Sequence, residues 1–281
     1  MYVDVVKERT INYVTRCRCV EGGFCFYRLE EPNASDTYYA LSILNLLGID
    51  IEDDDTVFYL KNLQKKDGSY SSIYSAYYSI KSLLLLNEKP ISSPRAYILN
   101  NINFYNVNKL PVEVISIFKP LWYLMDLCFR LKIELDDKLK RDLINFVLTF
   151  RNDDNGFGNT NSTLIETFQA LSILNWLDYE IDSLGVKSFI KRCESPVYGF
   201  VNVPNTAPSF IEHIHAGVMT SNLLDYKLHY ISQCVKFIMG CQNNNGGFSR
   251  GSIGISTLEN TYYAIESLVN LSTLILINQR E

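Results

Sequence analysis

The chain has 281 residues, of which 47% are hydrophobic and 20% charged, and its formal net charge is −5 at pH 7. The negative charge gives no electrostatic reason to expect nucleic acid or an anionic membrane surface as a partner. No apolar run approaches the ~20 residues that a membrane-spanning helix needs. The seven cysteines form no Cys-x-x-Cys pair and no N-terminal signal segment is recognised, so we expect reduced thiols in a cytoplasmic protein.

A short turn recurs along the chain, in which a glycine is followed within two residues by an aromatic residue. It contains, in chain order, Gly23, Gly68, Gly156, Gly199 and Gly247. The intervals between these glycines are 45, 88, 43 and 48 residues. Because 88 is close to two intervals, we expect a degenerate copy in residues 91–130. The sequence therefore predicts six repeats of about 45 residues.

Each repeat has the pattern of two helices. In the second repeat, apolar residues at helical spacing from Val57 to Leu63 predict a first helix, and the more apolar segment 77–84 predicts a second one. Asp53–Asp55 and Ser256-Thr257 are the expected helix start signals of the second and last repeats. Pro120 falls inside a predicted helix and is expected to kink it.

The two helices of a pair differ in how their apolar residues are distributed. The second is apolar nearly all round and should be buried, whereas the first is amphipathic. Twelve such helices predict two concentric rings, with six inner and six outer helices, in one domain over residues 1–281. The alternative is an open superhelix, whose ends would need capping.

Two copies carry a fuller motif, Gln64-x-x-x-Gly68-x-Tyr70 and Gln242-x-x-x-Gly246-x-Phe248. This motif resembles the repeat shared by squalene and terpenoid cyclases and by the β subunits of protein prenyltransferases. The other copies place Arg18, Arg151 and Glu194 where the glutamine belongs. The resemblance covers nearly the whole chain and implies an all-α (α/α)6 toroid whose central funnel takes an isoprenoid chain. Similar turns occur in other α/α toroids, so the motif specifies architecture more strongly than activity.

Polar residues recur at the predicted starts of the inner helices, which should face one end of the central cavity. Equivalent positions hold Asp36, Glu166, Glu212 and Asn260, and the next residues are Thr37, Thr167, His213 and Thr261. The side chains expected to contact the substrate below them are Tyr38, Tyr39, Tyr77, Trp122, Phe168, His215, Tyr262 and Tyr263. Aromatic faces can stabilise a carbocation and accommodate a prenyl chain. Each acid has a second interpretation as a helix cap, and each aromatic residue as core.

The resemblance implies two activities that can be compared with the residues present. Class II terpenoid cyclases protonate an alkene with an Asp-x-Asp-Asp motif, whose acid stays protonated through burial and a neighbouring carboxylate. The matching segment here is Asn33-Ala34-Ser35-Asp36-Thr37, so only the last aspartate and the threonine remain. Protein prenyltransferases bind zinc through Asp-x-Cys and His, and the matching positions hold Ser209, Ile211 and Asn260. We therefore expect no zinc site. Mg²⁺ is expected to bind only together with a diphosphate substrate.

The segment "SFIEHIHAG" holds two of the three histidines and loosely resembles a Glu-x-His-x-Gly stretch whose histidine contacts diphosphate in prenyltransferases. We predict that Glu212 and His213 act as an acid–base pair, with His215 reaching the diphosphate. The predicted catalytic residues are then Asp36, Glu166, Glu212 and His213.

These observations predict an isoprenoid-handling enzyme, either cyclase-like or a zinc-independent prenyltransferase-like enzyme, that binds a prenyl (diphosphate) substrate in the central cavity. One alternative is a non-catalytic lipid-binding or scaffold subunit that has lost the family's catalytic motifs. Another is a carbohydrate-active (α/α)6 enzyme with paired carboxylates, although only Trp122 and Trp176 could serve as sugar platforms. A partner subunit or a homo-oligomer is left open.

Overall fold

The computed structural model describes residues 2–27, 31–110 and 116–278 of the chain. Six of the helices in these ranges form an inner ring, namely α2 (Ala34–Leu46), α4 (Ile73–Leu85), α6 (Lys119–Arg130), α8 (Leu164–Trp176), α10 (Ile211–Leu223) and α12 (Leu258–Asn278). Six more lie outside them, namely α1 (Tyr2–Thr15), α3 (Asp54–Asn62), α5 (Arg95–Asn103), α7 (Asp137–Leu148), α9 (Lys187–Cys193) and α11 (Ile231–Gly240). Two short 3₁₀ turns, η1 (Val107–Lys109) and η2 (Ile181–Leu184), and one hairpin of β1 (Glu194–Ser195) and β2 (Gly199–Phe200) complete the described elements.

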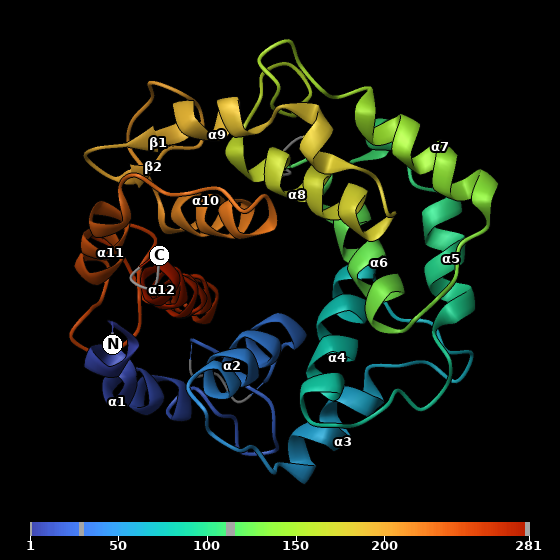
Figure 1. The fold of residues 1–281 in the computed structure, drawn as a ribbon. Helices are drawn as coiled ribbons and strands as arrows, with labels where there is room; N and C mark the ends of the chain where they lie inside the picture. The colour runs from blue at the N-terminus through green and yellow to red at the C-terminus, as the bar shows by residue number, and fades with distance from the viewer. Residues whose placement is uncertain (1, 28–30, 111–115, 279–281) are drawn as a thin grey trace.

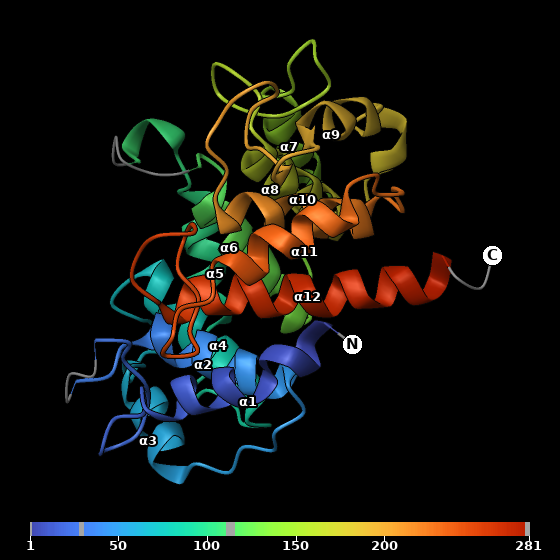
Figure 2. The same ribbon diagram turned by 90° about the vertical axis from the view of Figure 1, so that its left-hand side faces the viewer.

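The inner helices form a closed ring around a central axis (Figure 1). Each inner helix contacts the next one, and α12 packs against α2. Figure 2 shows the ring from the side, with α12 extending beyond the other inner helices. The predicted (α/α)6 toroid is therefore confirmed, and the open superhelix is wrong. In the described part of the chain, no helix is both long and apolar enough to cross a membrane.

Burial follows the difference in apolar pattern between the two kinds of helix. In α2 every side chain from Asp36 to Leu44 is buried, whereas α11 buries only Cys234 and Ile238 among its described residues. An inner helix packs against two inner neighbours and against outer helices, so the side left uncovered is mainly the one toward the axis of the ring. The outer helices need only one apolar stripe.

The glycine-aromatic turn is fastened to the inner helix that follows it. The backbone N–H groups of Phe24, Phe157 and Phe248 each donate a hydrogen bond to a threonine hydroxyl in the first turn of that helix, from Thr37, Thr167 and Thr261 respectively. The three phenylalanine rings are buried. The recurring threonines are therefore structural, and they explain why turn and helix start repeat together.

The residue at the glutamine position of the motif bonds to the start of the next helix pair. Gln64 exchanges hydrogen bonds with the backbone of Ser92, ahead of α5. The replacements make equivalent links by other chemistry. Arg18 pairs with Asp53, Arg151 donates to the carbonyl of Leu184, and Glu194 accepts from the N–H of His229. In the last copy Gln242 accepts from Arg9 of α1, which ties the end of the ring to its beginning.

The expected helix boundaries are largely present. Asp53 caps α3 by accepting from the N–H of Thr56, and the hydroxyl of Thr257 accepts from the N–H of Asn260 at the start of α12. The degenerate copy in residues 91–130 is confirmed by α5 and α6. The expected kink at Pro120 is wrong, because this proline stands in the first turn of α6, where a helix loses no hydrogen bond to proline.

Candidate functional site

A cavity of about 1180 Å³ lies inside the ring and is lined by residues of all six inner helices. It is larger than the ~300–1,000 Å³ usual for pockets that hold small molecules. Its lining on α8 runs from Ile165 to Trp176, a length of about 16 Å at 1.5 Å per residue. On α2 only the first half of the helix contributes. The space is therefore elongated along α6, α8, α10 and α12.

All eight predicted substrate-contacting residues line this cavity, namely Tyr38, Tyr39, Tyr77, Trp122, Phe168, His215, Tyr262 and Tyr263. Tyr38 lies at the centre of one wall, with the ring centroids of Tyr39, Tyr77 and Tyr262 between 5.5 and 6.2 Å away. Trp122 continues the wall towards Phe168 and Trp176. Their predicted position is confirmed, and their predicted role in binding remains a proposal.

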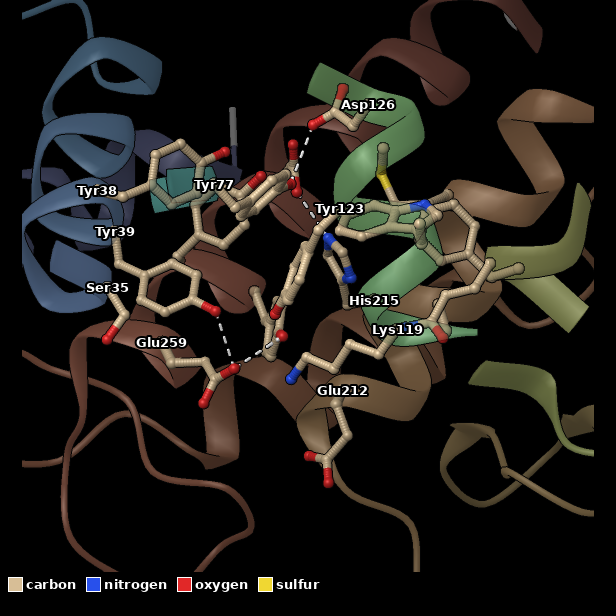
Figure 3. Close-up of a pocket in the computed structure, with 18 of the residues that line it drawn as sticks. Ser35, Tyr38, Tyr39, Tyr77, Lys119, Tyr123, Asp126, Glu212, His215 and Glu259 are labelled. Atoms are coloured by element: carbon tan, nitrogen blue, oxygen red, sulfur yellow. Dashed lines mark hydrogen bonds and ion pairs between the residues drawn. The ribbon is translucent and has the colours of Figure 1, made fainter. Parts of the chain in front are cut away.

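Tyrosines of the cavity wall form a hydrogen-bonded chain that ends on the carboxylate of Glu259, and Figure 3 shows the bond from Tyr39 to this carboxylate. The hydroxyls of Tyr39 and Tyr263 both donate to Oε1 of Glu259, at 2.9 and 3.0 Å. The hydroxyl of Tyr78 lies 2.9 Å from those of both Tyr39 and Tyr123. Burial raises the pKa of Tyr39 and of Tyr78, so both phenols stay protonated at neutral pH.

A charge cluster centred on the buried Asp126 lies in the cavity wall between α4 and α6. Asp126 pairs with Lys81 at 2.9 Å and with Arg130 at 2.7 Å, and it also accepts a hydrogen bond from the hydroxyl of Tyr77. The amine of Lys81 lies 4.7 Å from the ring centroids of Tyr38 and Tyr77. Burial acts to raise the pKa of Asp126, but the charges of Lys81 and Arg130 outweigh it, so the pKa lies below its usual value.

Sequence reasoning missed Lys81 and Arg130 and did not place Asp126 in the site. A signal was present, because Lys81 and Asp126 are isolated charged residues within segments that are otherwise almost entirely apolar. Such residues are rarely buried without a partner.

His215 is held by a carboxylate of the neighbouring inner helix. Its Nε2 lies 2.6 Å from Oε2 of Glu266, and its ring centroid is 4.6 Å from that of Tyr263. Burial acts to raise the pKa of Glu266, but the hydrogen bond and charge of His215 outweigh it and lower the pKa. Glu266 was not predicted from the sequence, since its pairing depends on the register between α10 and α12.

Two of the four predicted catalytic residues line the cavity. Oδ2 of Asp36 accepts hydrogen bonds from the N–H of Phe26 at 3.1 Å and from the side-chain amide of Asn33 at 2.8 Å. Burial raises the pKa of Asp36 despite these bonds. Glu212 accepts from Arg250 at 2.6 Å, and it too lines the cavity.

The other two predicted catalytic residues, Glu166 and His213, are not among the residues that line the cavity. Glu166 accepts hydrogen bonds from the N–H of Ile117, just ahead of α6, and from the hydroxyl of Thr163, the N-cap residue of α8. Nδ1 of His213 accepts from the N–H of Phe210 at 3.1 Å, which requires a neutral ring, and burial lowers its pKa. The expectation that Asp36, Glu212 and His213 open together into the cavity is therefore wrong for His213.

The residues at the positions of the family's zinc ligands do not fit a zinc ion. The hydroxyl of Ser209 donates to the carbonyl of Phe200, Ile211 is buried, and Asn260 lines the cavity as an amide. None offers the thiolate, imidazole or carboxylate that zinc requires. Within the described ranges, no three His, Cys, Asp or Glu side chains are gathered as a metal site needs. The expectation that the protein works without a cofactor stays a prediction.

Comparison with known proteins agrees with this geometry. The chain matches the model of the prenyltransferase alpha-alpha toroid domain over residues 2–79 and 94–281. No curated protein sequence matches it. Among solved structures, it is similar to Candida albicans protein geranylgeranyltransferase-I in complex with GGPP, with 16% identity, a TM-score of 0.69 and coverage of 93% of this chain and 90% of that one.

It is also similar to a type II terpene cyclase from Scytonema in complex with its substrate, geranylgeranyl dihydroxybenzoate. Here the identity is 10%, the TM-score is 0.62, and the match covers 97% of this chain and 98% of that one. At these identities the two structures establish a common fold, and the family model covers nearly the whole chain. The chain therefore belongs to the prenyltransferase alpha-alpha toroid family.

Proposed function

We propose that this protein binds an isoprenoid chain in the central cavity and acts on it as a cyclase-like enzyme. The observation that carries the proposal is the elongated aromatic cavity, in which Tyr38, Trp122 and Tyr262 present ring surfaces to one continuous space. Aromatic faces suit a branched, unsaturated hydrocarbon and attract positive charge that develops on it. The two similar structures each hold a geranylgeranyl group, which agrees with a prenyl ligand.

Asp36 is the candidate acid of this proposal. It lines the cavity close to the tyrosine wall, and burial raises the pKa of its carboxyl group. It would transfer its proton to a carbon of an isoprenoid double bond and leave a carbocation facing the rings. Transfer of a proton from the final carbocation to water, and reprotonation of the Asp36 carboxylate from solvent, would restore the charge balance and the enzyme.

A non-catalytic isoprenoid-binding role is the second candidate. It is favoured by the engagement of the other acidic groups, because Asp126 is paired with Lys81 and Glu212 with Arg250. Asp36 also accepts two hydrogen bonds that stabilise its ionised form, which opposes the protonated state that a proton donor needs near neutral pH. The catalytic and the non-catalytic role both require the same cavity. They differ only in whether the bound isoprenoid is chemically converted.

Binding can be measured without a label, because the chain has only two tryptophans, Trp122 and Trp176, and both line the cavity. Geranylgeraniol titrated into the protein should change the tryptophan fluorescence saturably. Ala216→Phe, which places a ring inside the cavity, should abolish the change. Ala96→Phe makes the same substitution at an exposed position of the outer helix α5 and should leave it intact. Equal responses of the two variants, or no response in the wild type, would refute isoprenoid binding in this cavity.

Turnover separates the two candidates. Mass spectrometry and chromatography of isoprenoids incubated with the protein should reveal a rearranged product if the protein is a cyclase, and Asp36→Asn should remove that product while fluorescence still reports binding. Binding without any product across a panel of prenyl substrates would favour the non-catalytic role.

A further inference from the structure

The charged side chains that line the cavity leave no excess of positive charge. In the described part of the lining, four lysine and arginine side chains stand against five carboxylates. The cationic residues are Lys81, Lys119, Arg130 and Arg250, and the acidic ones are Asp36, Asp126, Glu212, Glu259 and Glu266. A site that binds a multiply charged anion usually presents unpaired cations to it.

Most of the cations are already neutralised by an acid of the same cavity. Asp126 holds both Lys81 and Arg130, at 2.9 and 2.7 Å, and it is almost fully buried. Glu212 pairs with Arg250, whose Nη2 lies 2.5 Å from Oε1 of Glu212. The imidazole of His215, which was predicted to contact a diphosphate, lies 2.6 Å from Glu266 instead. An anion that used these groups would compete with carboxylates that already neutralise them, and a carboxylate left without its partner in a buried site is unfavourable.

Lys119 is the one lysine or arginine of the described lining for which no carboxylate lies within ion-pair distance in the described part of the chain. It reaches the cavity from the first turn of α6, and its amine lies 5.8 and 5.9 Å from the ring centroids of Tyr74 and Tyr123. One ammonium group cannot balance a diphosphate, since a single phosphate monoester already carries about −1.5 to −2 charge at pH 7.

We infer that the cavity selects an uncharged isoprenoid, such as a prenyl alcohol, and discriminates against a prenyl diphosphate. The inference rests on the proposed binding of an isoprenoid in this cavity and narrows its substrate class. The aromatic wall contacts the hydrocarbon part of either ligand equally. A hydroxyl group can hydrogen-bond to the tyrosines and to the paired charges without separating them, whereas a diphosphate meets acids whose cations are occupied.

The direct test compares geranylgeraniol with geranylgeranyl diphosphate by tryptophan fluorescence, in buffer with EDTA so that no divalent cation neutralises the diphosphate. The alcohol should bind at least ten times more tightly than the diphosphate. A diphosphate that binds as tightly as the alcohol, or more tightly, would overturn the inference and leave the proposed isoprenoid binding standing. If neither ligand binds, the proposed function fails and the inference fails with it.

A variant that should gain affinity for the diphosphate tests whether the pairing of the cavity charges causes the selection. Glu212→Gln removes the partner of Arg250 at the cavity and should raise the ratio of diphosphate to alcohol affinity several-fold. Asp178→Asn makes the same change in charge at an exposed pair with Lys140, and its positive φ of 60° is tolerated by asparagine. It should leave the ratio unchanged. If both variants shift the ratio equally, or if neither does, the pairing of cavity charges is not what selects the ligand.

Discussion

The hydroxyl group of Tyr39 donates a hydrogen bond to Oε1 of Glu259 at 2.9 Å and so joins the first inner helix to the last across 220 positions of the chain. This bond also fixes the direction of the tyrosine chain. Because Tyr39 donates its one proton to Glu259, it must accept from Tyr78. Tyr78 in turn accepts from Tyr123. The wall of the cavity is thus organised by the same contact that helps to close the ring.

Removing this hydroxyl should weaken the fold measurably. Tyr39→Phe leaves Glu259 with one fewer donor and deprives the buried hydroxyl of Tyr78 of its acceptor. We expect a loss of about 1–3 kcal/mol in the free energy of unfolding, measured by urea denaturation. Tyr74→Phe is the control, because Tyr74 is 47% exposed, and its loss should stay within about 0.5 kcal/mol. Equal losses for the two variants would contradict the role of the Tyr39 bond.

The last turn of the motif should tolerate no side chain where it meets the first helix. Gly246 has a φ of +94°, and a Cβ atom there would lie 2.1 Å from the carbonyl oxygen of Arg9. Gly48 has a φ of +70° and open space around its would-be Cβ. Gly48→Ala should therefore cost only the backbone strain of about 1–2 kcal/mol. Gly246→Ala adds a clash with backbone at the ring closure, and we expect about 3 kcal/mol or more, again by urea denaturation. Similar losses of unfolding free energy for the two variants would show that the ring closure accommodates the added methyl group.

His213 should make the stability of the protein depend on pH. Burial lowers its pKa, and its Nδ1 must stay unprotonated to accept from Phe210. A histidine of this kind stabilises the fold above its unfolded pKa of about 6.5, and that contribution is lost as the pH falls through this value towards the lower folded pKa. His213→Asn keeps an acceptor near Nδ1 and does not titrate. Thermal melts between pH 8 and 5 should show a steeper loss for the wild type than for the variant. Parallel curves would mean that His213 is not the titrating group.

The closed ring could be predicted from the sequence because the features that define the repeat are local. The glycine turns, the threonines after them and the alternation of amphipathic and apolar helices each depend on neighbouring residues only. The aromatic lining followed from the same alignment, since Tyr38 and Tyr262 occupy equivalent places in the first and last repeats. The expected kink at Pro120 is wrong because α6 begins only one residue before this proline. A pattern of apolar residues does not locate a helix boundary to within a few residues.

The polar part of the site could not be predicted in the same way, because it depends on side-chain direction and on register between helices. Glu212 and His213 are adjacent in sequence, yet only Glu212 lines the cavity, since consecutive residues of a helix point about 100° apart. The pairs Lys81–Asp126 and His215–Glu266 join residues 45 and 51 positions apart on different helices. The sequence around each of these residues does not identify its partner.

The charge cluster of Lys81, Asp126 and Arg130 should be the most sensitive part of the cavity wall. Asp126→Asn leaves two cations without a counter-charge, one of them buried, and breaking such a pair from one side costs about 3–5 kcal/mol. The cost should appear in urea denaturation at pH 7. The double variant Lys81→Met with Asp126→Leu should recover much of the loss, because an apolar replacement leaves no unpaired charge in the interior.

The pH dependence of this cost identifies its origin. Burial acts to raise the pKa of Asp126, and the charges of Lys81 and Arg130 lower it further than burial raises it, so the folded pKa lies below the unfolded value of about 3.9. The stability that Asp126 contributes is therefore complete above about pH 4 and is lost as the pH falls through the folded pKa. The difference between the wild type and Asp126→Asn should be constant from pH 7 to about pH 5 and should close below pH 4. Asp178→Asn, at an exposed pair, should cost less than about 1 kcal/mol throughout. A difference for Asp126→Asn that persists unchanged at low pH would mean that packing, and not the ionised pair, holds this wall together.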